Sequence, residues 1–214
     1  MVALDCEMVA VEGNQDALAR VSIVNYNGHV LMDRYVRPEK RIVDFRSWVS
    51  GVHPYHLKEE NGAISFAEAK AESLRILTNK IVVGHSLNHD FKVLEFAADD
   101  EKVRDLTRFT KYKNQFGQIK SLKNLTQDLL GKKIQQGEHS SVVDAQASLG
   151  LYRLYEKDWE NHVKQKAYSS ARKLVEKDVQ DLRKMNKFFG TQSGAKEAVS
   201  QAKKLSKKRF KKSF

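Results

Sequence analysis

Residues 1–9 read M-V-A-L-D-C-E-M-V, an apolar run interrupted by two acids, Asp5 and Glu7. Its length and aliphatic content predict a buried strand. Positions i and i+2 leave the same face of a strand, so the two carboxylates lie side by side, while Leu4 and Cys6 face apolar packing. Two unpaired charges in a sheet interior are costly. The pair therefore fits either a strand end that reaches water or a Mg²⁺ or Mn²⁺ site.

Further elements follow this strand along the chain. Asn27-Gly28 predicts a two-residue hairpin turn between the second and third strands. Ser65 and Glu68 have the spacing of a capping box and predict a helix that ends near Thr78. A short buried strand and three more helices follow. The expected strands cover residues 20–26, 29–36 and 81–84, and the later helices cover 90–98, 121–130 and 141–155. Strands first, then strand–helix alternation, predict a mixed sheet flanked by helices.

Two later motifs carry groups that could act together with Asp5 and Glu7. Asp90 ends V-V-G-H-S-L-N-H-D, where it follows a strand and a glycine turn and opens a helix. Ligands gather at this position in α/β sheets. His139 and Asp144 form H-S-S-V-V-D, with the histidine in a loop and the acid in the first turns of a helix. Each motif alone also fits a helix N-terminal acid or a solvated histidine.

The combination is more specific than its parts. Four carboxylates can hold two Mg²⁺ ions roughly 3.5–4 Å apart, an arrangement that suits in-line cleavage of a phosphodiester. A nearby imidazole can take the proton of the attacking water near neutral pH. These residues therefore point to metal-assisted phosphodiester hydrolysis.

Composition limits the class of protein. The chain has 214 residues and a formal charge of +11, with 41% hydrophobic residues, which is a globular mixture. Cys6 is the only cysteine, so a disulfide framework is excluded. No apolar run approaches a membrane span, and Asp5 and Glu7 interrupt the N-terminal apolar run too early for a signal peptide. We expect a soluble intracellular protein that does not bind membranes.

The positive charge is concentrated at the C-terminal end. Residues 157–214 hold 17 Lys or Arg and 6 Asp or Glu, whereas residues 1–156 hold 21 of each. The last part contains a lysine-rich run from Lys203 to Lys212. Such a run suits contact with nucleic acid or a nuclear-import receptor, and the plainer alternative is a solubilising terminus.

Residues 160–189 predict an amphipathic helix with a basic polar face. We expect this helix to pack on the domain; a partner-binding or RNA-binding helix is the alternative. The predicted organisation is one domain over residues 1–158, followed by a basic helical or disordered extension over residues 159–214.

Several segments together resemble the DEDDh class of 3′→5′ exonucleases, and most closely the eukaryotic RNA exonuclease 4 group with the related interferon-stimulated RNA exonuclease. The resemblance covers about residues 2–160. It is carried by A-L-D-C-E-M-V, R-P-E, V-S-G-V, V-V-G-H-S-L-N-H-D-F, E-H-S-S-V-V-D-A-Q-A and L-Y-R-L-Y-E-K-D-W-E. Members of the group often have an acid where Val143 stands, but that position is not a metal ligand.

The resemblance implies a fold and a set of roles. The fold is that of ribonuclease H, an α/β fold with a five-stranded mixed sheet between helices. The resemblance also implies two divalent cations, each of which could be Mg²⁺ or Mn²⁺. Asp5, Glu7 and Asp144 hold one ion. Asp5 bridges to the other ion, which Asp90 holds. The remaining roles fall to His139 as general base, Met8 as a wedge against the terminal base and Arg46 as a contact of the terminal sugar.

The implied activity is 3′→5′ exonucleolytic hydrolysis of single-stranded RNA to 5′-mononucleotides. The implied setting is ribosomal RNA processing on pre-ribosomal particles in the nucleus, in particular the nucleolus. One alternative is the same site acting on DNA or on both nucleic acids. Another is a non-catalytic RNA-binding scaffold. A zinc module built on Cys6, His53, His56 or His85 lacks the paired spacings of structural zinc sites.

Overall fold

The computed structural model describes residues 1–189, apart from several side chains near its C-terminal end. The chain divides into a unit of Met1–Glu156 and a second unit that begins at Lys157. Each is described by itself. The predicted lysine-rich run at residues 203–212 lies outside the described residues.

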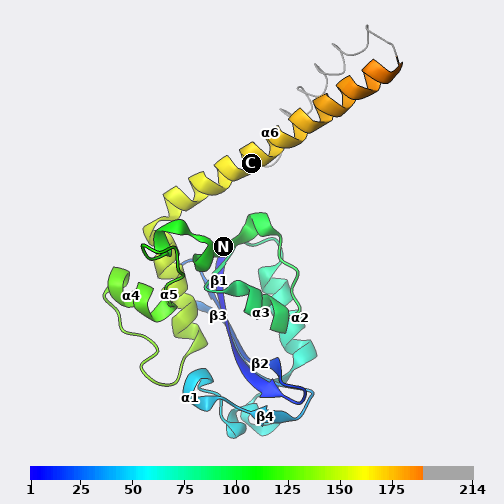
Figure 1. Cartoon of the computed structure of the whole chain (residues 1–214). Helices are drawn as coiled ribbons and strands as arrows, with labels where there is room; N and C mark the ends of the chain where they lie inside the picture. The colour runs from blue at the N-terminus through cyan, green and yellow to red at the C-terminus, as the bar shows by residue number, and fades with distance from the viewer. Residues whose placement is uncertain (190–214) are drawn as a thin grey trace. The chain divides into compact units, whose positions relative to one another are not determined.

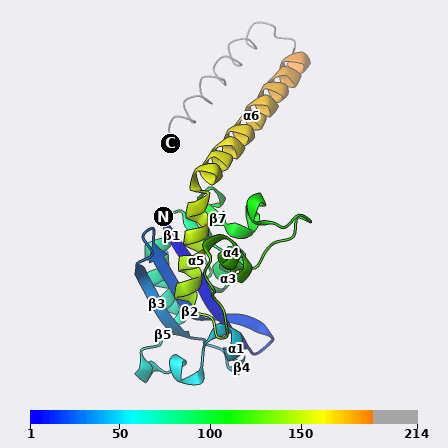
Figure 2. The same ribbon diagram turned by 90° about the vertical axis from the view of Figure 1, so that its left-hand side faces the viewer.

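The first unit is built on a mixed sheet, which in the described part of the chain has the order β5-β3-β2-β1-β6-β7, with β4 added beside β1. β1 pairs antiparallel with β2 and parallel with β6, and β6 pairs parallel with β7. Figure 2 shows β3, β2 and β1 side by side. The bounds are Val2–Val11 (β1), Gln15–Asn25 (β2), Val30–Arg37 (β3), Ile42–Asp44 (β4), Ile64–Ser65 (β5), Val82–Gly84 (β6) and Val103–Asp105 (β7).

The ribonuclease H-like α/β fold is confirmed. The strands expected over residues 1–9, 20–26, 29–36 and 81–84 are β1, β2, β3 and β6. The described sheet has seven strands instead of the five that the resemblance implied, because it also contains the short strands β4, β5 and β7. The turn between β2 and β3 differs from the expected two-residue turn. Gly28 N–H donates to the Asn25 carbonyl at 2.8 Å, and Asn25 N–H donates to His29. Only Gly28 has a positive φ, whereas the two-residue type I′ turn needs two such residues.

Helices cover both faces of the sheet (Figure 1). Their bounds are Ser47–Ser50 (α1), Phe66–Leu77 (α2), Leu87–Val93 (α3), Leu122–Leu130 (α4) and Ser141–Leu154 (α5). Val2, Leu4 and Cys6 of β1 pack in one core cluster with apolar residues of α2 and α3. The alternate residues of β1, including Asp5 and Glu7, face α5, because side chains alternate across a strand. α5 therefore covers the face that carries the acids.

Local sequence signals explain several helix ends. Ser65 caps α2 and forms the predicted capping box with Glu68. Ser121 caps α4, and Gly131 ends it with a φ of 65°. The helix expected over residues 90–98 is the exception, since α3 covers Leu87–Val93. Asp90 is its fourth residue and does not open it.

α6 runs from Glu156 to Phe189 and includes the helix predicted over residues 160–189; all of it except Glu156 belongs to the second unit. Among the helices of residues 1–189, none combines the length and the apolar character needed to cross a membrane.

Candidate active site

The acid pair lies in the middle of β1, on the face covered by α5. Glu7 is buried and Asp5 is half-buried. Glu7 is paired in the sheet with Arg20 of β2, and Asp5 with Ser22. A β-bulge follows directly, where the β1–β2 register shifts between Glu7 and Met8. The strand thus presents two carboxylates in the position expected from their i and i+2 spacing.

Asp90 reaches the edge of β1 from α3. On this side of β1, β6 pairs only at Val2 and Ala3 and β4 only at Ala10 and Val11, so no strand of residues 1–189 pairs with the β1 backbone between them. There Asp90 Oδ1 accepts a hydrogen bond of 2.8 Å from the backbone N–H of Cys6. The Asp90 carboxylate is thereby fixed beside the residue that separates the two acids of β1.

A glycine and a buried acid set the start of α3. A Cβ on Gly84, at the end of β6, would lie 2.9 Å from the Leu4 carbonyl and closer still to Leu87, so no larger residue fits without a shift. Asp105 Oδ1 and Oδ2 accept from the backbone N–H groups of Ser86 and Leu87 at 2.9 and 3.0 Å. These contacts position the helix that carries Asp90.

Asp144 lies in the first turn of α5 and is buried. The helix is tied to the sheet by a 2.6 Å hydrogen bond between the hydroxyls of Ser22 and Ser141. Asp144 Oδ2 accepts from Gln135 Nε2 at 2.8 Å. The second oxygen, Oδ1, is buried and has no hydrogen-bond partner among the described residues.

His139 lies in the loop before α5, as predicted, and α1 supports its backbone. Its N–H donates to the Val49 carbonyl at 2.7 Å. A Cβ on Gly51 would lie 2.7 Å from the His139 carbonyl, and Gly51 has a φ of +63°, so a side chain at this position would both clash and strain the backbone. His139 Nδ1 lies 3.8 Å from Asp144 Oδ2.

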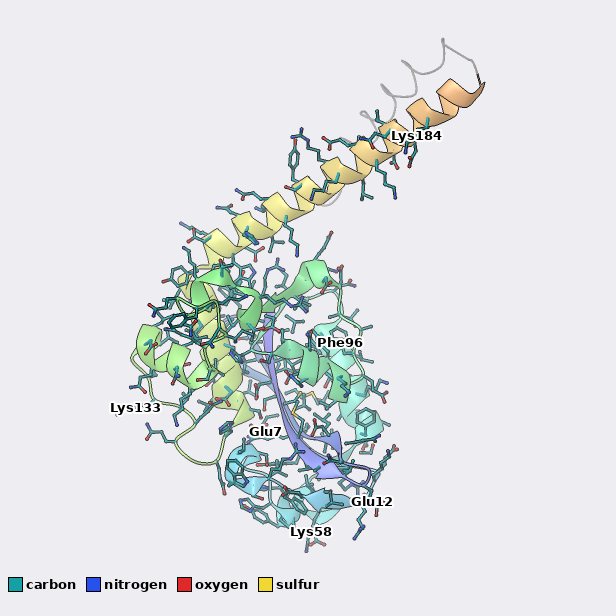
Figure 3. All side chains as sticks on the ribbon, in the orientation of Figure 1. Glu7, Glu12, Lys58, Phe96, Lys133 and Lys184 are labelled. Carbon is teal, nitrogen blue, oxygen red and sulfur yellow. The ribbon has the colours of Figure 1, made fainter. Side chains whose placement is uncertain are left out.

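Glu7, His139 and Asp144 converge. One ligand atom of each lies within 4.8 Å of the others. Glu7 Oε1, like Asp144 Oδ1, is buried without a hydrogen-bond partner among the described residues. Figure 3 shows Glu7 at the β1 ribbon, in the interior of the unit. Asp5 adjoins this group, since the charges of Asp90, Asp144 and Glu7 all act on it. We call Asp5, Glu7, Asp90 and Asp144 the acid cluster.

Burial and mutual repulsion make this cluster unfavourable when all its acids are ionised. Burial, reinforced by the charge of Asp144, raises the pKa of Glu7 to about 8. Burial also raises the pKa of Asp90 to about 7. The pKa of Asp5 is raised well above its ordinary value by burial and by the three neighbouring acids, and burial raises the pKa of Asp144. The cluster therefore favours protons or cations near neutral pH.

Replacement of Glu7 by Gln should stabilise the metal-free protein at pH 8. The pKa of Glu7 is raised on folding. Between about pH 4.5 and 8, the folded state therefore keeps a proton that the unfolded state has already released. Stability is fully present below that interval and falls as pH rises through it, by on the order of 5 kcal/mol for this one group. Denaturant unfolding of wild type and Glu7→Gln at pH 5 and pH 8, with chelator, measures the difference.

The same experiment with Mg²⁺ or Mn²⁺ provides the complementary control. The cation should raise the unfolding midpoint of wild type more at pH 8 than at pH 5, because protons and cations compete for the same oxygens. The cation should raise the unfolding midpoint of Glu7→Gln less than that of wild type. Equal pH dependence of the two proteins without metal would contradict the assigned environment of Glu7.

Met8 and Arg46, the two predicted substrate contacts, have other partners in this structure. Met8 is half-buried and packs against the core cluster of α2 and α3. Arg46 Nη1 forms a 2.7 Å ion pair with Asp16, and the Arg46 backbone has a φ of 48° just before α1. Arg46 lies three residues before Val49, whose carbonyl accepts from the His139 N–H. Contact of Arg46 with the terminal sugar stays a prediction.

The residues of the zinc alternative lie in different surroundings. Cys6 packs in the core with α2 and α3, whereas the His53 and His56 rings lie against the ring of Tyr55. His85 Nε2 bonds to the Lys120 carbonyl at 3.0 Å.

Sequence reasoning missed three residues that shape the site: Ser22, Asp105 and Gln135. Each acts through a partner distant in sequence, so no short motif identifies it. The short D-L-T segment at Asp105 resembles a cap, with Asp105 accepting from Thr107, but nothing in it indicates the bonds to Ser86 and Leu87.

Comparisons with known proteins agree with this geometry. The family model described as "Exonuclease" matches residues 2–152. RNA exonuclease 4 of Saccharomyces cerevisiae is 44% identical over 163 residues, which are 74% of this chain and 55% of the relative. The human interferon-stimulated 20 kDa exonuclease-like 2 is 44% identical over 171 residues, or 76% of this chain and 48% of the relative. The chain thus spans about half the length of these relatives.

Solved structures show the same fold. The Pan2 catalytic unit of Neurospora crassa superposes with a TM-score of 0.66 at 30% identity, over 79% of this chain and 29% of that one. A Saccharomyces cerevisiae Pan2 module in complex with A7 RNA gives a TM-score of 0.65 at 30% identity, over 80% and 31%. Since the family model covers nearly the whole first unit, strands and acid cluster included, the chain belongs to the exonuclease family.

Proposed function

We propose that this protein is a metal-dependent 3′→5′ exoribonuclease that releases 5′-mononucleotides from single-stranded RNA by two-metal-ion hydrolysis. The observation that carries the proposal is the acid cluster itself. Its four carboxylates have raised pKa values, and buried oxygens of Glu7 and Asp144 have no hydrogen-bond partner among the described residues. Membership of the exonuclease family and the names of the relatives support the substrate class.

The donor set fits divalent cations. Carboxylate oxygens are the ligands that Mg²⁺ and Mn²⁺ prefer, and cations would satisfy the two unpartnered oxygens while removing the repulsion among the acids. Asp5, Glu7 and Asp144 would hold one ion, and Asp5 and Asp90 the other. When bound, the ions would supply charge that promotes ionisation of water and stabilises the scissile phosphate.

The remaining chemistry belongs to the chain's own side chains. His139, in a loop beside Glu7 and Asp144, takes the proton from the attacking water. Gln135 holds one oxygen of Asp144, so the other is free to point into the cluster. The Cys6 N–H donates to Asp90 and so fixes the Asp90 carboxylate at the edge of β1.

Two other functions compete with this one. The same site could digest DNA, since none of the contacts described above distinguishes a 2′-hydroxyl. A non-catalytic RNA-binding scaffold is a different class. Product analysis separates them: incubation of the full chain with RNA or DNA and Mg²⁺ should release nucleoside 5′-monophosphates, faster from RNA. RNA that stays bound and is not cleaved would favour the non-catalytic scaffold.

The proposed cellular role is ribosomal RNA processing on pre-ribosomal particles, in the nucleus and in particular the nucleolus. Its support is the resemblance to RNA exonuclease 4 and the concentration of positive charge in residues 157–214. Imaging of the tagged full chain and of a variant without residues 195–214 tests the location.

Deletion of residues 195–214 should weaken RNA binding and flatten its salt dependence. The segment holds eight Lys or Arg and one acid. Each lost phosphate contact lowers the slope of log affinity against log salt by about 0.7 for single strands. Hydrolysis of a short oligonucleotide should change little. Equal slopes with and without the segment would exclude the contact and leave nuclear import or solubility as its role.

A further inference from the structure

Residues 109–137, which we call the basic segment, carry the positive charge of an otherwise acidic first unit. The segment contains six lysines and one acid, Asp128. The rest of residues 1–156 holds fifteen basic and twenty acidic residues. The segment includes α4 and the loops on either side of it. Its charge is therefore local, and it is separate from the charge of residues 157–214.

Half of these lysines are available to a ligand. Lys120 forms an ion pair with Asp128, Lys123 donates to the Gln135 carbonyl, and Lys111 lies over the Tyr155 ring. For Lys113, Lys132 and Lys133, by contrast, the structure of residues 1–189 gives no ion pair. Lys132 and Lys133 are exposed, and Figure 3 shows Lys133 at the outer edge of the unit.

The basic segment is hydrogen-bonded to the acid cluster through Gln135. Its side chain donates to Asp144 at 2.8 Å, and its carbonyl accepts from Lys123 at 2.9 Å. The Lys120 carbonyl is bonded to His85, which directly follows the end of β6. Lys133 is two residues from Gln135, so their Cα atoms are at most about 7 Å apart. A nucleic-acid strand that leaves the acid cluster can therefore reach Lys133 and the adjacent Lys132.

A rigid turn in the segment presents an aromatic ring to solvent. The Asn114 side chain accepts from the N–H groups of Phe116 and Gln118, both at 2.9 Å, and Gly117 N–H donates to the Asn114 carbonyl. The Phe116 side chain at this turn is 76% exposed. Exposed rings beside lysines are the usual platform for single-stranded nucleic acid, because every base can stack.

We propose that the basic segment binds the backbone of the single-stranded RNA upstream of the scissile 3′ end, with Phe116 stacked on one of its bases. The proposal rests on the proposed function, since it assumes that the 3′ end occupies the acid cluster. The RNA would then contact two surfaces: the acid cluster at its 3′ end and the basic segment, which does not bind metal.

The first experiment measures RNA binding without cleavage. A fluorescent single-stranded RNA of 12 nucleotides is titrated with the full chain in chelator at several salt concentrations. The triple variant Lys113→Gln, Lys132→Gln, Lys133→Gln should lower the salt slope by about 2, at about 0.7 per lost phosphate contact. The matched control, Arg75→Gln, Lys80→Gln, Lys102→Gln, removes the same charge around α2 and β7 and should match wild type. Equal slopes for both variants would overturn the proposal.

The second experiment tests stacking. Phe116→Ala should weaken binding of the same RNA roughly 5- to 100-fold. Phe116→Trp should preserve it, and Phe116→Leu should behave like Phe116→Ala. Wild-type affinity of Phe116→Leu would overturn the stacking role and indicate a merely apolar contact, such as one with a protein partner.

The two proposals fail in different ways. If wild type never digests RNA but the basic-segment variants lose RNA binding, the exonuclease assignment is wrong and this surface stands as an RNA-binding site. If wild type digests RNA and the variants bind it normally, only the assignment of the basic segment is wrong.

Discussion

Replacement of Asp5 by Asn is expected to reduce the rate of RNA hydrolysis by about 10³-fold or more, because it removes one anionic oxygen from the position that both ions would share. Folding should not suffer. Burial and three neighbouring acids raise the pKa of Asp5, so the metal-free wild type already disfavours this charge, and the amide has nearly the same shape. Single-turnover digestion with saturating Mg²⁺ measures the loss.

Two controls make that result interpretable. Asp100→Asn changes an exposed acid on the same unit and should leave the rate unchanged. RNA binding by Asp5→Asn in chelator should match that of wild type, since the metal-free wild type already disfavours the Asp5 charge and the amide has nearly the same shape. An Asp5→Asn protein that digests RNA at the wild-type rate would show that the site is wrongly assigned.

Replacement of His139 by Ala is expected to reduce the rate by about 10²–10⁴-fold, the usual contribution of a positioned general base. The His139 backbone is held by Val49 and by the close approach of Gly51, so removal of the ring leaves the loop in place. RNA affinity should therefore stay near that of wild type while the single-turnover rate falls.

His29, on the exposed hairpin between β2 and β3, provides the matched control, and His29→Ala should be indistinguishable from wild type. A loss below about tenfold for His139→Ala would transfer the role of base to another group. Loss of RNA binding in parallel with rate would instead mark His139 as a substrate contact.

Local signals predicted the parts of the fold that depend on neighbours in sequence. The capping box of Ser65 and Glu68 is encoded within four residues, and α2 begins where it was expected. α4 begins at Leu122, one residue after the expected start at Ser121, which caps it. The alternation of β1 likewise placed Asp5 and Glu7 on one face, because a strand has a fixed period.

The limits of α3 were wrong because distant or unusual backbone contacts set them. The helix begins early, since Asp105, eighteen residues beyond Leu87, accepts from its first N–H groups. It ends early because Glu95 adopts a φ of 51°, a conformation that no sequence signal announces for a glutamate. Phe96 N–H then donates to the Phe91 carbonyl and closes the end.

The acid cluster was predictable residue by residue, but its electrostatics were not. Motif spacing names Glu7 and Asp144; only the fold shows that one oxygen of each is buried without a partner among the described residues. The partners that orient the cluster, Gln135 and the Cys6 N–H, come from backbone geometry and from a loop of no recognisable pattern.

The most direct test of the central claim uses matched single-stranded RNA and DNA oligonucleotides labelled at the 5′ end. Digestion by the full chain is followed with Mg²⁺, with Mn²⁺ and with chelator. We predict a ladder that shortens from the 3′ end with either metal, faster on RNA, and no change in chelator. Digestion that persists in chelator, or tight binding with no cleavage under any metal, would contradict the account.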